Sequence, residues 1–215
     1  MVRSMRKIYT SILIALVIGG KAVGQEQKNV SDCIVNYTVS IQGTKDDKAG
    51  GKIMPATTKT LYIKGVKSRT DLETPNFTQV VIYDSKTDSS VVLRELGNAK
   101  YISYLDGKGR KDKNQKYEGI KFTETGETKT VVGYECRKVV AKLADGSSYN
   151  VFYTSSIVPS AGYEYQFKDL PGLVLEYEAS FEQGDTRVTF TASNITFTPV
   201  PVAKFDVPKN GYRIL

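Results

Sequence analysis

Residues 33–41 read Cys-Ile-Val-Asn-Tyr-Thr-Val-Ser-Ile, and this stretch decides the fold class. Every second position is apolar: Cys33, Val35, Tyr37, Val39 and Ile41. The positions between them are mostly polar, with Asn36, Thr38 and Ser40. A period of two predicts a β-strand that buries one face and exposes the other.

The same alternation recurs at short intervals along the rest of the chain, with turn residues between the runs. It predicts strands over 60–63, 66–72, 78–83, 91–96, 101–105, 120–124, 130–143, 149–153, 174–180 and 187–197. Segments 44–58 and 108–116 are predicted loops, because they are rich in Gly and Lys. After the N-terminal segment, no stretch has the period of a long amphipathic helix. The sequence therefore predicts an all-β, mainly antiparallel domain that forms a barrel, a half-barrel or a sandwich.

Three local predictions concern strand ends and turns. Segment 130–143 is expected to be one uninterrupted strand. Four of its residues would lie on the same face: Val132, Tyr134, Cys136 and Val140. Asp145-Gly146 is the clearest hairpin signal in the chain. Leu170-Pro171-Gly172-Leu173 is expected to be a tight turn, in which Pro171 fixes φ and Gly172 supplies a positive φ.

The N-terminal segment has the features of an export signal. Three basic residues precede an apolar run over 8–20, and a small-x-small cleavage site follows at 22–24. The apolar run is shorter than the roughly 18–20 residues that span a bilayer. We therefore expect a signal peptide at 1–24 and a single β-rich domain at 25–215. That domain is expected to be exported to the periplasm or exterior of a Gram-negative bacterium, with no transmembrane span after cleavage.

The composition excludes several kinds of chemistry. The chain has 215 residues, two Cys, no Trp and no His. Without His there is no Ser-His-Asp or Cys-His machinery and no His-ligated zinc, and two Cys cannot build a four-cysteine zinc site. Loss of residues 1–24 removes four basic residues and no acid, which lowers the net charge from +7 to +3. We expect no cofactor, no metal and no nucleic-acid partner.

Cys33 and Cys136 form the disulfide candidate of this chain. Both lie in the part expected to be exported, where an oxidising compartment permits a disulfide. The alternative is two separate buried thiols that pack as small hydrophobic side chains. The sequence leaves both open, because it does not show whether the two Cα atoms lie within the ~7 Å that a bridge needs.

Two pairs of carboxylates lie close together in the sequence, Glu124 with Glu127 and Glu176 with Glu178. A glycosidase needs two carboxylates that converge across a cleft. Neighbouring acids on one strand face are instead expected to face water. We therefore expect a protein without catalytic residues, and a carboxylate hydrolase is a remote alternative.

Aromatic residues are the more distinctive part of the composition, with fourteen Tyr and eight Phe. Many of them fall in or beside predicted strands. Aromatic side chains favour sheets and fill half-buried faces. Alternatively, a curved sheet presents them on a concave apolar face that holds an acyl chain or another hydrophobic ligand.

Segment 128–177 carries three motifs in a fixed order. Thr130-Val-Val-Gly-Tyr-Glu-Cys-Arg-Lys138 is followed by Val151-Phe-Tyr-Thr154 and then by Leu170-Pro-Gly-Leu-Val-Leu-Glu-Tyr177. This order resembles the GLPGLI family and the related DUF4412-like secreted proteins of Bacteroidetes. The pattern of these families is a Gly-Tyr-x-Cys-x-Lys strand, an aromatic-Tyr-Thr strand and a Gly-Leu-Pro-Gly-Leu-Ile turn.

The chain departs from this pattern at Asp169, in place of the first Gly, and at Val174, in place of the terminal Ile. Such families resemble the periplasmic lipoprotein carriers, whose antiparallel half-barrel surrounds a hydrophobic cavity. The resemblance implies no established activity and no catalytic residue. The signature residues that it carries over are structural: Gly133, Tyr134, Cys136, Lys138, Tyr153, Leu170, Pro171, Gly172 and Leu173.

Together, the residues and the resemblance favour a non-enzymatic cell-envelope protein that binds a hydrophobic small molecule or lipid in a β half-barrel. The alternative is a structural or interaction protein of the envelope, with a filled core, no ligand and an envelope protein as partner.

Overall fold

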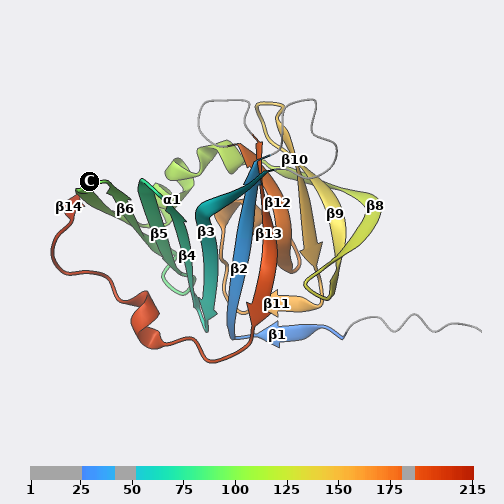
Figure 1. Cartoon of the computed structure of the whole chain (residues 1–215), viewed down its shortest axis with the longest axis horizontal. Coiled ribbons are helices and arrows are strands. Elements are labelled where there is room, and N and C mark those ends of the chain that lie inside the picture. Colours follow the sequence, from blue (N-terminus) through green and yellow to red (C-terminus); the bar gives the residue numbers. More distant parts are fainter. Residues whose placement is uncertain (1–25, 42–51, 181–186) are drawn as a thin grey trace, which may run out of the picture.

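Figure 1 shows a computed structural model of the chain, in which residues 26–41, 52–180 and 187–215 are described. The described chain consists mainly of β-strands, and its longest helix has 7 residues. The described helices all fall short of the length and apolar character that a bilayer crossing requires. The predicted signal peptide at 1–24 lies outside the described residues.

The strands and helices follow one another at short intervals. They are β1 (Lys28–Val30), β2 (Asp32–Ile41), β3 (Lys52–Lys64), β4 (Lys67–Thr74), β5 (Phe77–Asp84), β6 (Ser89–Leu96), β7 (Ala99–Leu105), α1 (Gly107–Lys113), η1 (Gln115–Tyr117), β8 (Lys121–Val131), β9 (Tyr134–Lys142), β10 (Ser148–Thr154), β11 (Ile157–Pro159), η2 (Tyr165–Phe167), β12 (Leu173–Ser180), β13 (Arg187–Thr196), η3 (Val202–Phe205) and β14 (Arg213–Ile214), where η marks a 3₁₀ turn.

Twelve strands form one sheet in the order β14-β7-β6-β5-β4-β3-β2-β13-β12-β10-β9-β8. Neighbouring strands in it are antiparallel, except that β14 runs parallel to β7. The end strands β8 and β14 do not pair with one another, so the sheet is curved but not closed (Figure 1). A separate parallel pair, β1 with β11, lies across one end of the sheet (Figure 1). The predicted all-β, mainly antiparallel fold with an open, curved sheet is confirmed.

The hairpin between β8 and β9 corrects one prediction. Val132 and Gly133 have φ values of 42° and 83° and connect two paired strands, with Val131 opposite Tyr134. The single strand predicted over 130–143 is therefore wrong. Two positive φ angles are typical of the two-residue turns that match the twist of a hairpin. Gly133 adopts its angle without a steric penalty, whereas Val at the preceding position gives no sequence signal for such a turn.

Two predicted loops are also partly wrong. Segment 108–116 contains helix α1, whose N-terminus is capped by Asp106: the carboxylate accepts a hydrogen bond from the Gly109 amide at 2.7 Å. Strand β3 begins at Lys52, inside the loop predicted over 44–58. Because β3 starts early, its inward-facing positions include Lys59 and Thr57, both of which are buried.

The two faces of the sheet are buried against different parts of the chain. Because side chains alternate along a strand, Leu61 and Ile63 of β3 face one side and Tyr62 faces the other. On the Leu61 side lies the inner core, which includes Val35, Tyr37, Leu61, Ile63, Val151, Phe167, Leu173, Leu175, Tyr177 and Phe190. On the Tyr62 side lies the tail core, made of Val80, Ile82, Leu93, Ile102, Val200 and Phe205. The C-terminal tail covers the second core as it runs from β13 to β14 along the outside of the sheet (Figure 1).

Candidate binding site

Four aromatic rings gather in the inner core. Tyr177 stacks on Phe190 with ring centroids 4.8 Å apart. It also meets Phe167 and Tyr37 in edge-to-face geometry at 5.0 and 6.5 Å. The Tyr37 hydroxyl donates to the Val174 carbonyl oxygen at 2.8 Å, which satisfies this buried polar group. The rings therefore pack against one another in the interior.

A lysine side chain lies among these rings. Lys59, on β3, has a side chain that is 3% exposed, and its ammonium donates to the Glu164 carboxylate and to the Tyr177 hydroxyl. Its Nζ lies 4.5, 5.0 and 5.1 Å from the ring centroids of Tyr177, Phe190 and Tyr37. Aromatic faces within ~6 Å attract a desolvated cation. One buried ammonium is thus held by a carboxylate, a hydroxyl and three rings.

The Lys59 ammonium joins Glu164 and Tyr177, so the three side chains form one cluster. Burial lowers the pKa of Lys59, and the neighbouring Glu164 carboxylate opposes that shift. Burial raises the pKa of Tyr177 well above its ordinary value, and Glu164 adds to the rise. A charge held away from water is tolerated only while its partner remains. Lys59 and Glu164 therefore depend on one another.

Tyr163 fixes the segment that brings Glu164 to Lys59. Its hydroxyl donates to the Gly172 carbonyl oxygen and accepts from the Val174 amide, each at 3.0 Å. This buried hydroxyl ties the segment between β11 and β12 to the start of β12 on both sides of Leu173. Glu164 therefore occupies a defined place beside the inner core.

Gly172 completes the turn that leads into β12. Its amide donates to the Leu170 carbonyl oxygen at 3.0 Å, which closes a three-residue turn. Gly172 is not among the glycines with a positive φ, so the predicted positive φ is wrong. A Cβ at this position would lie 2.1 Å from the Thr154 carbonyl oxygen. Glycine is required here because two stretches of backbone approach closely.

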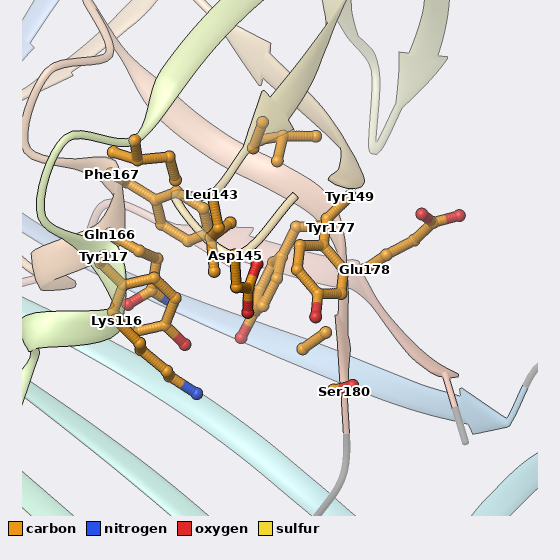
Figure 2. A pocket seen from close by; sticks show the side chains of 14 residues that line it. Lys116, Tyr117, Leu143, Asp145, Tyr149, Gln166, Phe167, Tyr177, Glu178 and Ser180 are labelled. Atoms are coloured by element: carbon orange, nitrogen blue, oxygen red, sulfur yellow. The ribbon is translucent and has the colours of Figure 1, made fainter. Parts of the chain in front are cut away.

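Tyr177 lines a pocket of about 220 Å³, which we name the Tyr177 pocket. Its lining side chains are drawn in Figure 2. Tyr117, Gln166 and Phe167 lie on one side of it, and Tyr149 and Tyr177 lie on the other (Figure 2). The remaining lining residues are Lys116, Ile120, Ala141, Leu143, Asp145, Val151, Glu178, Ala179 and Ser180. The lining of the Tyr177 pocket is thus mainly apolar and aromatic, with a few charged side chains.

A second pocket, of about 320 Å³, is named the Arg110 pocket. Three cationic residues line it, together with two acids and three tyrosines: Arg110, Lys111, Lys168, Asp88, Glu164, Tyr83, Tyr163 and Tyr165. The Arg110 guanidinium lies 3.6 Å from the Tyr83 ring centroid and pairs with Asp88. Glu164 therefore both pairs with Lys59 in the inner core and lines a pocket that contains charges of both signs.

The two cysteines are buried free thiols in the structure. This arrangement is the second of the two alternatives that the sequence leaves open. Burial raises the pKa of Cys33 to about 12 and that of Cys136 to about 11. A thiol with a raised pKa holds little reactive thiolate, as is typical of structural cysteines.

The other signature residues lie in strands and turns. Leu173 is fully buried, and Leu170 and Tyr134 pack against the inner core. The Tyr153 hydroxyl donates to Glu124 at 3.2 Å, and the Lys138 ammonium donates to Glu127 at 2.9 Å. None of these contacts joins the Lys59–Glu164–Tyr177 cluster.

The acids singled out from the sequence do not converge. Glu176 pairs with Lys129 and accepts from the Thr191 hydroxyl at 2.9 Å. Glu178 accepts from the amide and the side chain of Asn150, and its carboxylate points away from the Tyr177 pocket (Figure 2). Their side chains are 17% and 11% exposed, so the prediction that they face water is wrong. Across the described residues, no group of three or more Asp, Glu or Cys could hold a metal ion.

Sequence reasoning missed Lys59 and Glu164. The signal for Lys59 is its phase: with Leu61 and Ile63 facing inward, a period of two places Lys59 on the same side. A charged residue in an inward position needs a partner of opposite charge. The sequence does not show which acid this is, because Glu164 lies 105 residues away and outside any regular strand.

Several solved structures are similar to this chain at low sequence identity. The chain aligns with the structure of PNGF-II at a TM-score of 0.54 and 17% identity, over 85% of this chain and 30% of that one. It is also similar to an uncharacterized conserved protein from Thermus thermophilus, with a TM-score of 0.46 and 10% identity, over 86% and 90% of the two chains. A third is a β-barrel-like protein of DUF1849 from Brucella abortus, with a TM-score of 0.38 and 10% identity, over 79% and 99%.

The chain spans 30% of the length of PNGF-II, and at 17% identity this likeness shows the fold alone. No curated protein sequence matches this chain. The family model described as "Domain of unknown function (DUF4412)" matches residues 52–172, which include Lys59, Glu164 and the signature positions 133–172. This match covers more than half of the chain and confirms the DUF4412-like resemblance: the protein belongs to the DUF4412 family.

Proposed function

We propose that this protein is an exported, non-enzymatic binding protein of the cell envelope. It takes the apolar end of a small amphiphile into the Tyr177 pocket. The observation that carries the proposal is the lining of that pocket, where apolar residues such as Leu143 and Phe167 lie next to Lys116 and Asp145. Export is supported by the charged and apolar pattern of residues 1–24.

The size of the pocket limits the ligand. About 220 Å³ is more than the ~150 Å³ of an apolar cavity that binds benzene. It is less than the ~300–1,000 Å³ of pockets that enclose drug-sized ligands. A single ring or the terminal carbons of an acyl chain match this volume, and the rest of a longer lipid would stay outside, near the charged groups.

Binding of uncharged n-alkanols tests this proposal. Calorimetric titration of the purified protein with the series from butan-1-ol to decan-1-ol should show affinity that rises several-fold per added carbon, because each buried CH₂ contributes ~0.8 kcal/mol. The rise should stop once the pocket is full. Binding that is absent, or independent of chain length, would contradict the proposal.

Ala179 offers a way to close the pocket. It lies on β12 two residues from Tyr177, on the same face of the strand, and it lines the pocket. Ala179→Leu should abolish alkanol binding by filling the space. Ala203→Leu adds the same side chain at an exposed tail position and should leave binding unchanged.

A second candidate is an interaction protein of the envelope with a filled core. It is favoured by the aromatic rings and the Lys59–Glu164–Tyr177 cluster, which occupy the space that a deep ligand cavity would need. Failure of every alkanol to bind, together with recovery of one stoichiometric envelope protein after cross-linking in cells, would favour this candidate.

A further inference from the structure

We propose that the ligand of the Tyr177 pocket carries a flat aromatic ring, which packs between the Tyr117 ring on one wall and the Tyr149 ring on the other. The inference rests on the proposed function and deepens it, because it decides between the two apolar ends that the pocket could take, a ring or an acyl chain. The polar part of the ligand stays outside, near the charged groups. The two tyrosines on opposite walls carry the inference.

The pocket lies between the inner face of the sheet and two short turns. Tyr149 on β10 and Tyr177 on β12 form part of the sheet wall, since Val151, two residues after Tyr149, lies directly opposite Tyr177. Tyr117 ends the turn η1 and lies on the other side of the pocket with the residues of η2 (Figure 2). A molecule in the pocket therefore has an aromatic side chain on each side.

The rings of Tyr117 and Tyr149 have no ring partner within the described parts of the chain. The ring contacts of the other aromatic lining residues, Phe167 and Tyr177, hold those two side chains in the inner core. Tyr117 and Tyr149 are half-buried and take part in none of these contacts. Aromatic pairs are favourable beyond the area that they bury. A ligand ring would therefore give both tyrosines a partner that the protein itself does not supply.

The volume of the pocket brings a single ring against both walls. An apolar cavity of ~150 Å³ takes up benzene, so one six-membered ring fills most of the 220 Å³ of the Tyr177 pocket. Such a ring meets side chains from the sheet and from the turns together. An acyl chain of the same volume gains only from the area that it buries, because its CH₂ groups have no π-face to stack.

Both walls are held in place by the backbone. The Tyr117 amide donates to the Asn114 carbonyl oxygen at 2.8 Å, and the Ile120 amide donates to the Tyr117 carbonyl oxygen at 3.3 Å. Tyr149 lies opposite Ala141 in the pairing of β10 with β9. Walls that are positioned before the ligand arrives lose less conformational freedom on binding. A preference for a flat ring can therefore be built into the pocket.

The first measurement compares benzyl alcohol with cyclohexylmethanol by calorimetric titration of the unaltered protein. The two probes have the same number of carbon atoms and the same hydroxyl group, and the saturated ring has the larger apolar surface. Buried area alone would favour cyclohexylmethanol. Stacking on two walls should reverse this order, so that benzyl alcohol binds about threefold more tightly.

The outcomes of this comparison separate the two proposals. If cyclohexylmethanol binds as tightly as benzyl alcohol or more tightly, or if only the n-alkanols bind, the aromatic assignment falls and the proposed function stands. If neither the ring probes nor the n-alkanols bind, both proposals fall.

Substitutions on the two walls assign the preference to the tyrosines. Tyr149→Leu and Tyr117→Leu each keep an apolar side chain and remove one ring, so each should weaken benzyl alcohol several-fold more than cyclohexylmethanol. Tyr149→Phe restores the ring without the hydroxyl and should restore the preference. Tyr104→Leu makes the same change at a side chain that is 58% exposed and does not line the pocket, and it should behave as the unaltered protein. A preference that persists in both leucine variants of the pocket would overturn the inference.

Thermal unfolding keeps the test decisive if a leucine variant folds poorly. A ligand that binds only the folded state raises the unfolding temperature. Millimolar benzyl alcohol should therefore raise the unfolding temperature of the unaltered protein by more than the same concentration of cyclohexylmethanol does. Equal increases would overturn the preference for an aromatic ring without recourse to any variant.

Discussion

The inner core and the tail core lie on opposite faces of one sheet and differ in what they contain. The inner core holds a buried cation, a carboxylate and interlocking aromatic rings. The six residues of the tail core are apolar, and the ion pair beside them on the same face, Arg69 with Asp71, has side chains that are 18% and 11% exposed, against 3% for Lys59. The tail is joined to the sheet by polar contacts around this core: Arg69 donates to the Lys204 carbonyl oxygen at 2.6 Å, and the Val200 amide donates to Asp32 at 2.9 Å.

This difference indicates which of the two cores could bind a particular chemical group selectively. An apolar cluster such as the tail core gains stability from buried area and tolerates changes of shape. A buried polar cluster stabilises only the arrangement that satisfies every member. The inner core is therefore both the more fragile region and the one able to recognise a particular chemical group.

The largest expected effect comes from breaking the charge pair of the inner core. Glu164→Gln leaves the Lys59 ammonium buried without its carboxylate, which should lower the free energy of unfolding at pH 7 by about 3–5 kcal/mol. Urea denaturation followed by circular dichroism measures it. The exposed control Glu127→Gln, which removes an ion pair at the surface, should change stability by less than about 1 kcal/mol.

The pH dependence of Glu164→Gln identifies Lys59 as the cause. Glu164 raises the pKa of Lys59 against the effect of burial, so its loss moves that pKa further below the ordinary value of 10.5. At pH values between the folded-state pKa of Lys59 and 10.5, the unfolded variant binds more protons than the folded variant. The free energy of unfolding of Glu164→Gln should therefore rise with pH in that window. A variant whose stability loss is the same at pH 7 and pH 10 would contradict this assignment.

A smaller loss of stability is expected from a substitution at Gly172, in the turn that leads into β12. Gly172→Ala places a Cβ 2.1 Å from the Thr154 carbonyl oxygen, so the strand or the turn must shift. Overpacking of this kind costs about 1–3 kcal/mol. Gly162→Ala is the matched control, because its nearest neighbour is the Tyr83 ring at 3.2 Å and its φ is not positive. Equal denaturation midpoints for the two variants would show that the close approach at Gly172 is not a constraint.

The smallest effect is expected in the tail core. Val200→Ala removes two methyl groups from a residue that is 1% exposed, and should lower the free energy of unfolding by about 1.5 kcal/mol. Val188→Ala, equally buried in the inner core, removes the same atoms. Hydrogen exchange should speed up in β5–β7 for the first variant and in β2, β12 and β13 for the second. Faster exchange in the same strands for both would show that the two cores unfold together.

The sequence predicted most strands well because one face of most of them is buried, and burial imposes the period of two. It failed where a single backbone angle or a distant partner decides the structure. Val132 has a positive φ that β-branched residues rarely adopt, so no pattern marks the turn before Tyr134. The buried Lys59 is stabilised by its ion pair with Glu164, and these two residues are 105 positions apart in the sequence.

Strand β8 has a consequence for how molecules of this protein meet. As an end strand it presents unpaired backbone groups, which in other proteins template aggregation. Its side chains include Lys121, Glu124, Glu127 and Lys129, and its register with β9 shifts between Glu124 and Thr128. Charges and an irregular backbone discourage a strand of another molecule from docking there. At the opposite end, β14 pairs with β7 and covers part of that edge, so both ends of the twelve-stranded sheet offer little regular backbone to a strand of another molecule.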